Sequence, residues 1–217
     1  MTRLRPTFLA AALIPVLAAC GAARAPRTAM GPEVFKARAR ADSLRYPYTQ
    51  ADIEFMSGMI HHHAQALVMS KMAPTHGASP AIIRLTERII NAQNDDIVLM
   101  SNWLRDRNQP VPAPNPMGMP MDHGGMSHTM LMPGMLTEEQ MQQLDAARGE
   151  EFDRLFLTGM IQHHRGAVVM VRELFSAQGA GQDETMFKFA ADVEVDQSTE
   201  IKRMVTMLLE MGAIPPS

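Results

Sequence analysis

Cysteine and aromatic residues are scarce in this sequence, whose 217 residues include only 1 Cys, 1 Trp, 2 Tyr and 8 Phe. A single cysteine excludes an intrachain disulfide, so a hydrophobic core must stabilise the fold. The formal net charge is −3 and Lys and Arg are not clustered, so nucleic acid is not expected as a partner. Motifs such as Gly-x-Ser-x-Gly, His-Glu-x-x-His and Gly-rich phosphate loops are absent. The sequence therefore predicts neither an enzyme nor an organic cofactor.

Residues 1–19 have the character of an export signal. A basic start precedes an apolar run that ends at the only cysteine, Cys20. The stretch LAACG at residues 17–21 resembles the lipobox of bacterial lipoproteins, which implies cleavage before Cys20 and acylation of that residue. The alternative is an ordinary cleaved secretory signal. The apolar run is shorter than the roughly 20 residues of a spanning helix. We therefore expect a lipid-anchored protein of the bacterial cell envelope that faces the periplasm or the exterior.

The rest of the chain is predicted to form one helical domain behind a tether. Residues 20–48 are interpreted as the tether with a short N-terminal helix, and residues 49–212 as the domain. Capping patterns and apolar residues at a period of about 3.6 predict long helices at 49–72, 79–106, 150–177 and 184–211. Residues 108–136 are rich in Pro, Gly, Met and His and are expected to form an irregular connector. No segment alternates convincingly as a strand does.

One segment of the sequence occurs twice in nearly the same form. GMIHHHAQALVM occupies residues 58–69, and GMIQHHRGAVVM occupies residues 159–170, a shift of 101. In the helices that follow, a shift of 104 pairs Gln93, Asp96, Ile97 and Met100 with Gln197, Glu200, Ile201 and Met204. The chain is thus interpreted as a helix hairpin written twice, with repeat one at 49–107 and repeat two at 137–212. Two hairpins joined by one long connector predict an all-α fold, a ferritin-like four-helix bundle.

In each copy, histidine and methionine share one face of the predicted helix. At about 100° per residue, that face carries Met59, His62, His63 and Met69 in the first copy and Met160, His163, His164 and Met170 in the second. His61 falls almost opposite, and its counterpart is Gln162. His61 is therefore expected at the solvated surface, and the other residues are expected to converge on a common axis.

Imidazole and thioether groups favour Cu(I), Ag(I) or Cu(II) over Mg²⁺ or Ca²⁺. A Met at i and His at i+3 and i+4 lie within one turn, so these eight residues are predicted metal ligands. The alternative is a set of polar core histidines, whose ring nitrogens are bonded to Asp52, Asp153, Gln93 or Gln197. An imidazole has a reference pKa of about 6.5 and must be neutral to ligate. Acidification to about pH 5 is therefore expected to weaken the histidine site.

Methionine is unusually frequent, with 21 residues, many of them in the connector. Most helical methionines are interpreted as flexible core fillers. The connector methionines have no helical core position, so a weaker metal-capture segment is predicted, with candidate ligands Met117, Met119, Met121, His123, Met126 and His128. The alternative is a low-complexity linker whose methionines fold back over the bundle.

Together these motifs resemble the bacterial domain of unknown function 305 family. The resemblance rests on Asp-x-x-Phe followed by Met-Ile-x-His-His and a distal Met, twice over, with MPGMLTEEQ before the second copy and NDDIVLMSNWL after the first. It covers roughly residues 50–209 and implies a ferritin-like bundle, an envelope location and, for some members, copper binding linked to metal tolerance through Met and His. Arg165 stands where the first copy has Ala64, which predicts a more electropositive and weaker second site.

We therefore expect an envelope lipoprotein that binds copper or silver ions through Met and His for sequestration, delivery or metal tolerance. Its contact with the membrane is expected through the lipid anchor alone. The alternative is a non-metallated helical envelope module that binds a protein partner, with the histidines structural.

Overall fold

The computed structural model describes residues 31–45, 47–123 and 126–216. The predicted signal peptide and the predicted lipidation site Cys20 lie outside these residues. The described chain is mostly helical with one small sheet, and its elements are α1 (Pro32–Arg45), α2 (Gln50–Met72), the short 3-10 helix η1 (Ala73–Thr75), α3 (Pro80–Asp106), β1 (Met119–His123), β2 (Met126–Met130), α4 (Glu138–Ala146), α5 (Gly149–Ser176) and α6 (Glu184–Glu210). Within it, no helix combines the length and the apolar character that crossing a membrane requires.

Two of the long helices, α2 and α3, begin at the capping residues that the sequence indicates. At the start of α2 the Thr49 N–H donates to Asp52 Oδ2 over 2.6 Å. At the start of α3 the Ser79 side chain accepts a hydrogen bond from the Ile82 N–H, and Pro80 occupies the first turn. A side chain that caps the free N–H groups of a first turn contributes about 1 kcal/mol. The four predicted long helices agree with the observed ones to within one residue at each end.

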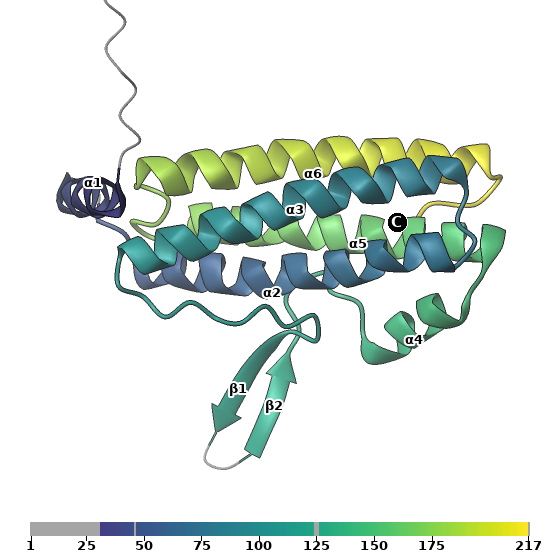
Figure 1. The fold of residues 1–217 in the computed structure, drawn as a ribbon, viewed down its shortest axis with the longest axis horizontal. Coiled ribbons are helices and arrows are strands. Elements are labelled where there is room, and N and C mark those ends of the chain that lie inside the picture. Colours follow the sequence, from purple (N-terminus) through teal and green to yellow (C-terminus); the bar gives the residue numbers. More distant parts are fainter. Residues whose placement is uncertain (1–30, 46, 124–125, 217) are drawn as a thin grey trace, which may run out of the picture. The chain divides into compact units, whose positions relative to one another are not determined.

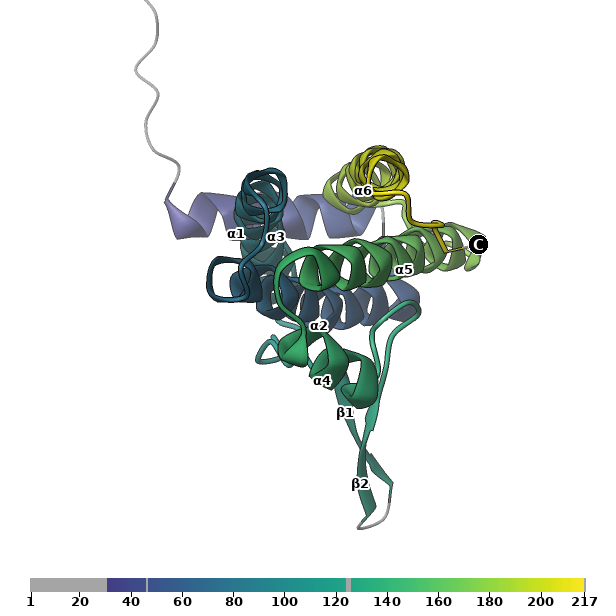
Figure 2. The same cartoon turned by 90° about the vertical axis from the view of Figure 1, so that its right-hand side faces the viewer.

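Four long helices form the body of the described chain (Figure 1). Helix α2 packs against α3, α5 packs against α6, and the two pairs meet where α2 lies against α5. Figure 2 shows α3 and α6 on the same side of α2 and α5. The end of α3 is joined to the start of α6 by Asp183, which accepts a hydrogen bond from Trp103 Nε1 and pairs with Arg107. The histidine segments of α2 and α5 therefore lie in the middle of the helical body.

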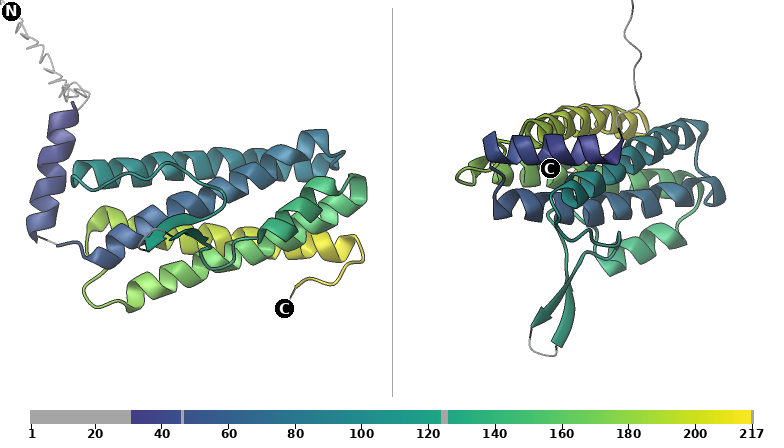
Figure 3. Two further views of the ribbon diagram at one scale, coloured as in Figure 1. Left: turned by 90° about the horizontal axis from the view of Figure 1, so that it is seen from below. Right: turned by 60° about the vertical axis from the view of Figure 1, so that its left-hand side comes forward.

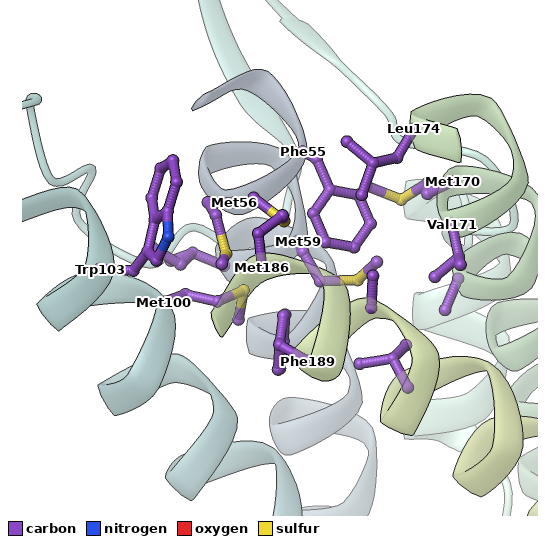
Figure 4. Packing of buried hydrophobic residues seen from close by; sticks show 14 of the residues in the cluster. Phe55, Met56, Met59, Met100, Trp103, Met170, Val171, Leu174, Met186 and Phe189 are labelled. Atoms are coloured by element: carbon purple, nitrogen blue, oxygen red, sulfur yellow. The ribbon is translucent and has the colours of Figure 1, made fainter. Parts of the chain in front are cut away.

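Methionine fills much of the core between these helices. Met56, Met59, Met100 and Met186 are fully buried and pack with Phe55 in one apolar cluster (Figure 4). An unbranched thioether adapts to the irregular gaps between aromatic and aliphatic side chains. The interpretation of Met56 and Met186 as packing residues agrees with this arrangement.

The connector contains a β-hairpin instead of being wholly irregular. Strand β1 pairs antiparallel with β2, in a register that runs from Met119 opposite Met130 to His123 opposite Met126. The hairpin projects from the four helices (Figures 1 and 3). Gly118 has a φ of 105°, and a Cβ there would lie 2.4 Å from the Met130 carbonyl oxygen. The prediction that no segment forms a strand is wrong, because Met and His alternate here in place of the β-branched residues typical of strands.

Two buried side chains tie both ends of the connector to α2. Gln65 donates to the carbonyl oxygens of Pro116 and Leu136, at 2.9 and 3.0 Å, and accepts from the Leu136 N–H at 2.6 Å. His61 Nδ1 accepts from the Asn115 N–H at 3.1 Å. His61 is only 2% exposed, so the prediction of a solvated His61 is wrong. The connector covers the face of α2 that helical periodicity alone leaves to solvent.

Candidate metal site

Four histidines meet where α2 lies against α5. The rings of His62 and His163 have centroids 3.8 Å apart, and each has a neighbour on its own helix, His63 at 6.3 Å and His164 at 6.2 Å. All four residues are at most 1% exposed. The structure therefore brings the two predicted histidine pairs together from facing helices.

The two central rings each use one nitrogen in a hydrogen bond to a carbonyl oxygen. His62 Nε2 lies 3.1 Å from the Pro133 oxygen, and His163 Nε2 lies 2.9 Å from the His62 oxygen. A carbonyl oxygen can only accept, so Nε2 carries the proton in each neutral ring. The Nδ1 atoms of His62 and His163 are then unprotonated and present a lone pair.

The two outer histidines bond to acidic side chains on the outer helices. His63 Nε2 lies 3.1 Å from Asp96 Oδ2 on α3, and His164 Nε2 lies 2.6 Å from Glu200 Oε2 on α6. The 104-residue shift pairs Asp96 with Glu200, so the two contacts are equivalent. Acidic residues at matching positions of both copies were the one sequence feature that could have revealed these partners.

The two aspartates considered as histidine partners in the sequence have other roles. Asp52 accepts a hydrogen bond from the Gly181 N–H at 2.7 Å, and Asp153 accepts from the Ser79 N–H at 3.1 Å. The buried amide of Gln93 has no hydrogen-bond partner within the described chain. Asp52 and Asp153 therefore connect helix ends and loops, and the carboxylates that hold the histidines are Asp96 and Glu200.

The second nitrogen of each histidine, Nδ1, is buried and has no hydrogen-bond partner among the described residues; this applies to His62, His63, His163 and His164. A buried polar group without a partner costs about 1–3 kcal/mol. Metal-ligating histidines divide their nitrogens in this way, with one on the metal and the other donating to a carbonyl or carboxylate oxygen. The four rings therefore have the hydrogen-bond pattern of metal ligands with Nδ1 as the ligand atom.

The His, Asp and Glu side chains alone do not form a complete metal site. In the described part of the chain, no three or more His, Cys, Asp or Glu side chains are grouped so that they could hold a metal ion. Met59 and Met160 each precede a histidine pair by about one turn on the same helix face, and both are fully buried. Met59 and Met160 are therefore the methionines that lie next to a histidine pair on the same helix.

The distal methionines of the repeated segment contact a glycine of the opposite helix. A Cβ on Gly58 would lie 3.5 Å from Met170 Cε, and a Cβ on Gly159 would lie 3.3 Å from Met69 Cε. The missing side chain at each glycine leaves room for the end of the methionine. This reciprocal contact explains why Gly and Met bound both copies of the segment, and it places Met69 and Met170 at the contact between α2 and α5.

The predicted connector ligands lie on the hairpin and just before it. Met117 is 39% exposed, and Met119 and Met121 are partly buried. The structure describes only the backbone of His123, Met126 and His128, and the register places Met121 opposite His128. Met or His therefore occupies alternate positions of both strands.

Arg165 turns toward the end of the chain. Its Nη1 atom donates to the Pro216 carbonyl oxygen at 2.9 Å. The equivalent position on α2 is Ala64, which is buried. The weaker second site expected from Arg165 remains a prediction.

Burial keeps the central histidines neutral. Desolvation, followed by the charge of His63, lowers the pKa of His62 from 6.5 to about 3. Desolvation, followed by the charge of His62, lowers the pKa of His163 well below 6.5. The expectation that acidification to about pH 5 weakens the site remains a prediction; the lowered pKa values of these two rings act against it, because a buried imidazole among other imidazoles resists a positive charge. With a pKa of about 3, the His62 ring stays neutral, and able to ligate, at pH 5.

The helical fold and its repeated histidine segment agree with one protein family. The family described as Domain of unknown function (DUF305) matches residues 52–208. The protein therefore belongs to the DUF305 family, as its motifs predicted. A search of curated proteins gives no match.

Solved structures of similar proteins share this fold. A Streptomyces coelicolor DUF305 protein, described as secreted, is 27% identical with a TM-score of 0.64, over 77% of this chain and 97% of that one. A DUF305 fragment from Deinococcus radiodurans is 25% identical with a TM-score of 0.61, over 75% and 98%. CopM in its Cu(II)-bound form is 31% identical with a TM-score of 0.56, over 74% and 97%. CopM is also known in Cu(I)-bound and Ag-bound forms.

Proposed function

We propose that this protein binds copper or silver ions where α2 meets α5, for sequestration, delivery or metal tolerance in the cell envelope. The observation that carries the proposal is the set of buried Nδ1 atoms without partners in His62, His63, His163 and His164. Neutral imidazole and thioether ligands suit these ions. The copper-bound and silver-bound forms of CopM support the choice of metal.

In this proposal each helix supplies one half of the ligands. Helix α2 contributes Met59 with His62 and His63, and α5 contributes their counterparts, Met160 with His163 and His164. Asp96 and Glu200 hold the outer rings and make their Nδ1 atoms more basic by accepting from Nε2. The role is binding and transfer of the ion and not catalysis.

The proposal includes a ferritin-like arrangement of the long helices. It is supported by the two helix pairs, α2 with α3 and α5 with α6, and by the contact between α2 and α5. In such bundles, metal sites are built from side chains of facing helices. The position of the histidines between α2 and α5 agrees with that plan.

Anaerobic titration with Cu(I) against a competing chelator tests the histidine site. The full chain should be purified without a nickel column. Replacing all four histidines by Ala should weaken the tightest binding by more than about 100-fold, since loss of even an outer-shell partner costs about 10–100-fold. Because that variant removes four buried rings, Asp96→Asn and Glu200→Gln provide a milder test in partly exposed positions, with an expected loss of about 10-fold or more.

His76→Gln is the matched control for this titration. His76 is also a buried histidine, but both of its nitrogens have partners, Thr75 Oγ1 at 3.0 Å and the Asp145 carbonyl oxygen at 2.9 Å. This variant should bind Cu(I) as wild type does. If the four-histidine variant stays folded by circular dichroism and binds as tightly as wild type, the histidines belong to the core and the proposal is wrong.

The second candidate function is a helical module that binds a protein partner. Apolar side chains on the outer helices favour it: Val98 on α3 is 59% exposed, and Phe187 and Val195 on α6 are 57% and 64% exposed. Contiguous exposed apolar residues often mark interaction surfaces. A folded protein that binds neither Cu(I) nor Cu(II) would favour this alternative.

The proposed envelope location includes a lipid anchor at Cys20. It is supported by the LAACG stretch and by the similarity to a protein described as secreted. Expressed in a bacterium, the wild-type chain should incorporate labelled palmitate and partition into detergent, because acylation adds a long apolar chain. Cys20→Ala should lose the label. A wild-type protein that is exported without taking up palmitate would show that the anchor is absent.

A further inference from the structure

Three methionines from separate segments gather around Gly58 on α2. From the position that a Cβ of Gly58 would occupy, Met132 Sδ lies at 3.1 Å, Met170 Cε at 3.5 Å and Met119 Cε at 3.9 Å. Met119 belongs to β1, Met132 follows β2, and Met170 belongs to α5. In methionine the sulfur is bonded directly to Cε, so the sulfur atoms of Met119 and Met170 lie one bond from the Cε atoms that approach this point.

The three side chains are buried or partly buried and able to adjust. Met132 is 8% exposed, Met170 is 7% exposed and Met119 is partly buried. Three rotatable bonds let a methionine turn its sulfur toward a new partner at little cost. The three sulfur atoms can therefore turn toward a bound ion by rotation of their own side chains.

The equivalent position in the second copy shows that packing does not require this sulfur. A Cβ on Gly159 would lie 2.9 Å from Leu136 Cδ2 and 3.3 Å from Met69 Cε. Both glycines thus receive the distal methionine of the opposite helix. The connector adds an aliphatic side chain at Gly159, whereas at Gly58 it adds two thioethers. Met132 and Met170 belong to the same apolar cluster as Met56 and Met59, and Met119 packs against it, so what distinguishes Gly58 from Gly159 is that three thioethers meet there.

We propose that Met119, Met132 and Met170 form an all-thioether site for a soft monovalent cation, Cu(I) or Ag(I), at Gly58. Thioethers select Cu(I) and Ag(I) over harder divalent ions, so this site discriminates against Zn²⁺ and Cu(II). This site would bind the same ions as the histidine site, and it rests on the proposed function only for the choice of metal. Its ligands are separate from the four histidines. The site lies where the hairpin meets α2 and α5.

Silver binding to two single variants of the full chain provides the decisive test. Met170→Leu and Met186→Leu are volume-conserving changes, and Met186 is a fully buried core methionine that belongs to no proposed metal site. By equilibrium dialysis with Ag(I), Met170→Leu should bind one ion fewer than wild type, or bind it about tenfold more weakly, whereas Met186→Leu should match wild type. Neither change touches the connector, so its other methionines contribute equally in both.

X-ray absorption at the silver edge separates this site from the histidine site. The four-histidine variant should retain an Ag(I) ion with sulfur-only coordination, and a Met119→Leu, Met132→Leu, Met170→Leu triple variant should lose it while keeping Cu(II) binding. Equal losses in Met170→Leu and Met186→Leu, or none in the triple variant, would overturn the thioether site. Loss of all silver in the four-histidine variant would also overturn it. Normal Cu(I) and Cu(II) binding by a folded four-histidine variant would overturn the proposed function and leave this site standing.

Discussion

Replacement of Asp183 by Ala should lower the free energy of unfolding by about 3–5 kcal/mol, the cost of leaving a buried charge without its partner. Asp183 is fully buried and has three bonds: it pairs with Arg107, accepts from Trp103 Nε1 at 3.0 Å and caps α6 by accepting from the Met186 N–H at 3.0 Å. Arg107 is itself only 9% exposed, and its guanidinium lies 4.2 Å from the Trp103 ring centroid. One substitution therefore leaves a buried cation unpaired and disconnects α3 from α6.

Urea unfolding followed by circular dichroism measures this loss. Asp192→Ala is the control, because Asp192 lies on the same helix in an exposed pair with Lys188 and should change stability by less than about 1 kcal/mol. Asp183→Asn should fall between the two, since the amide keeps an acceptor for Trp103 but loses the charge. A loss below about 1 kcal/mol in Asp183→Ala would show that water or a rearranged side chain replaces the carboxylate.

Acidification of the metal-free protein from pH 7 to pH 5 should lower the free energy of unfolding by about 2 kcal/mol through His62 alone. The pKa of His62 is 6.5 when exposed and about 3 in the fold. Above pH 6.5 neither state binds the proton, so stability does not change. Between pH 6.5 and about 3 only the unfolded state binds it, so stability falls as the pH falls. His163 acts in the same direction because burial lowers its pKa as well.

A double variant, His62→Leu with His163→Leu, provides the comparison. Urea unfolding at pH 7, 6 and 5 should show a shallower decline than in wild type. His61 keeps part of the slope in both proteins, since burial also lowers its pKa. Equal declines in wild type and the double variant would show that the central rings accept protons in the folded protein. In the metal-bound protein, His62 should still be able to ligate at pH 5, because its pKa of about 3 keeps that ring neutral there.

The long helices and the pairing of the histidines follow from the sequence for local reasons. A helix start depends on a side chain that caps the first turn, as Thr49 and Ser79 show, and its buried face depends on the spacing of apolar residues. The 101-residue shift sets His62 beside His163 because equivalent positions on two similar helices face a common axis. The helix starts and the histidine-bearing faces depend on residues that are close together in the sequence of each helix.

The hydrogen-bond partners of the histidines were decided by the packing of the helices. Asp96 and Glu200 reach His63 and His164 only because α3 and α6 pack beside α2 and α5 with each acid level with its histidine. The sequence offers several acids and amides at similar spacing, and periodicity cannot choose among them. The lowered pKa of His62 has the same origin, because desolvation depends on everything packed around a ring.

The course of the connector belongs wholly to the tertiary structure. Periodicity puts His61 on the outer face of α2, but the connector crosses that face and buries it. The same crossing places Met119 and Met132 at Gly58 and Leu136 at Gly159, so two nearly identical helix segments acquire different chemical surroundings. The sequence by itself determined the helices and the face that holds their histidines. Only the packing of distant segments decided the neighbours of that face, because such contacts depend on residues far apart in the chain.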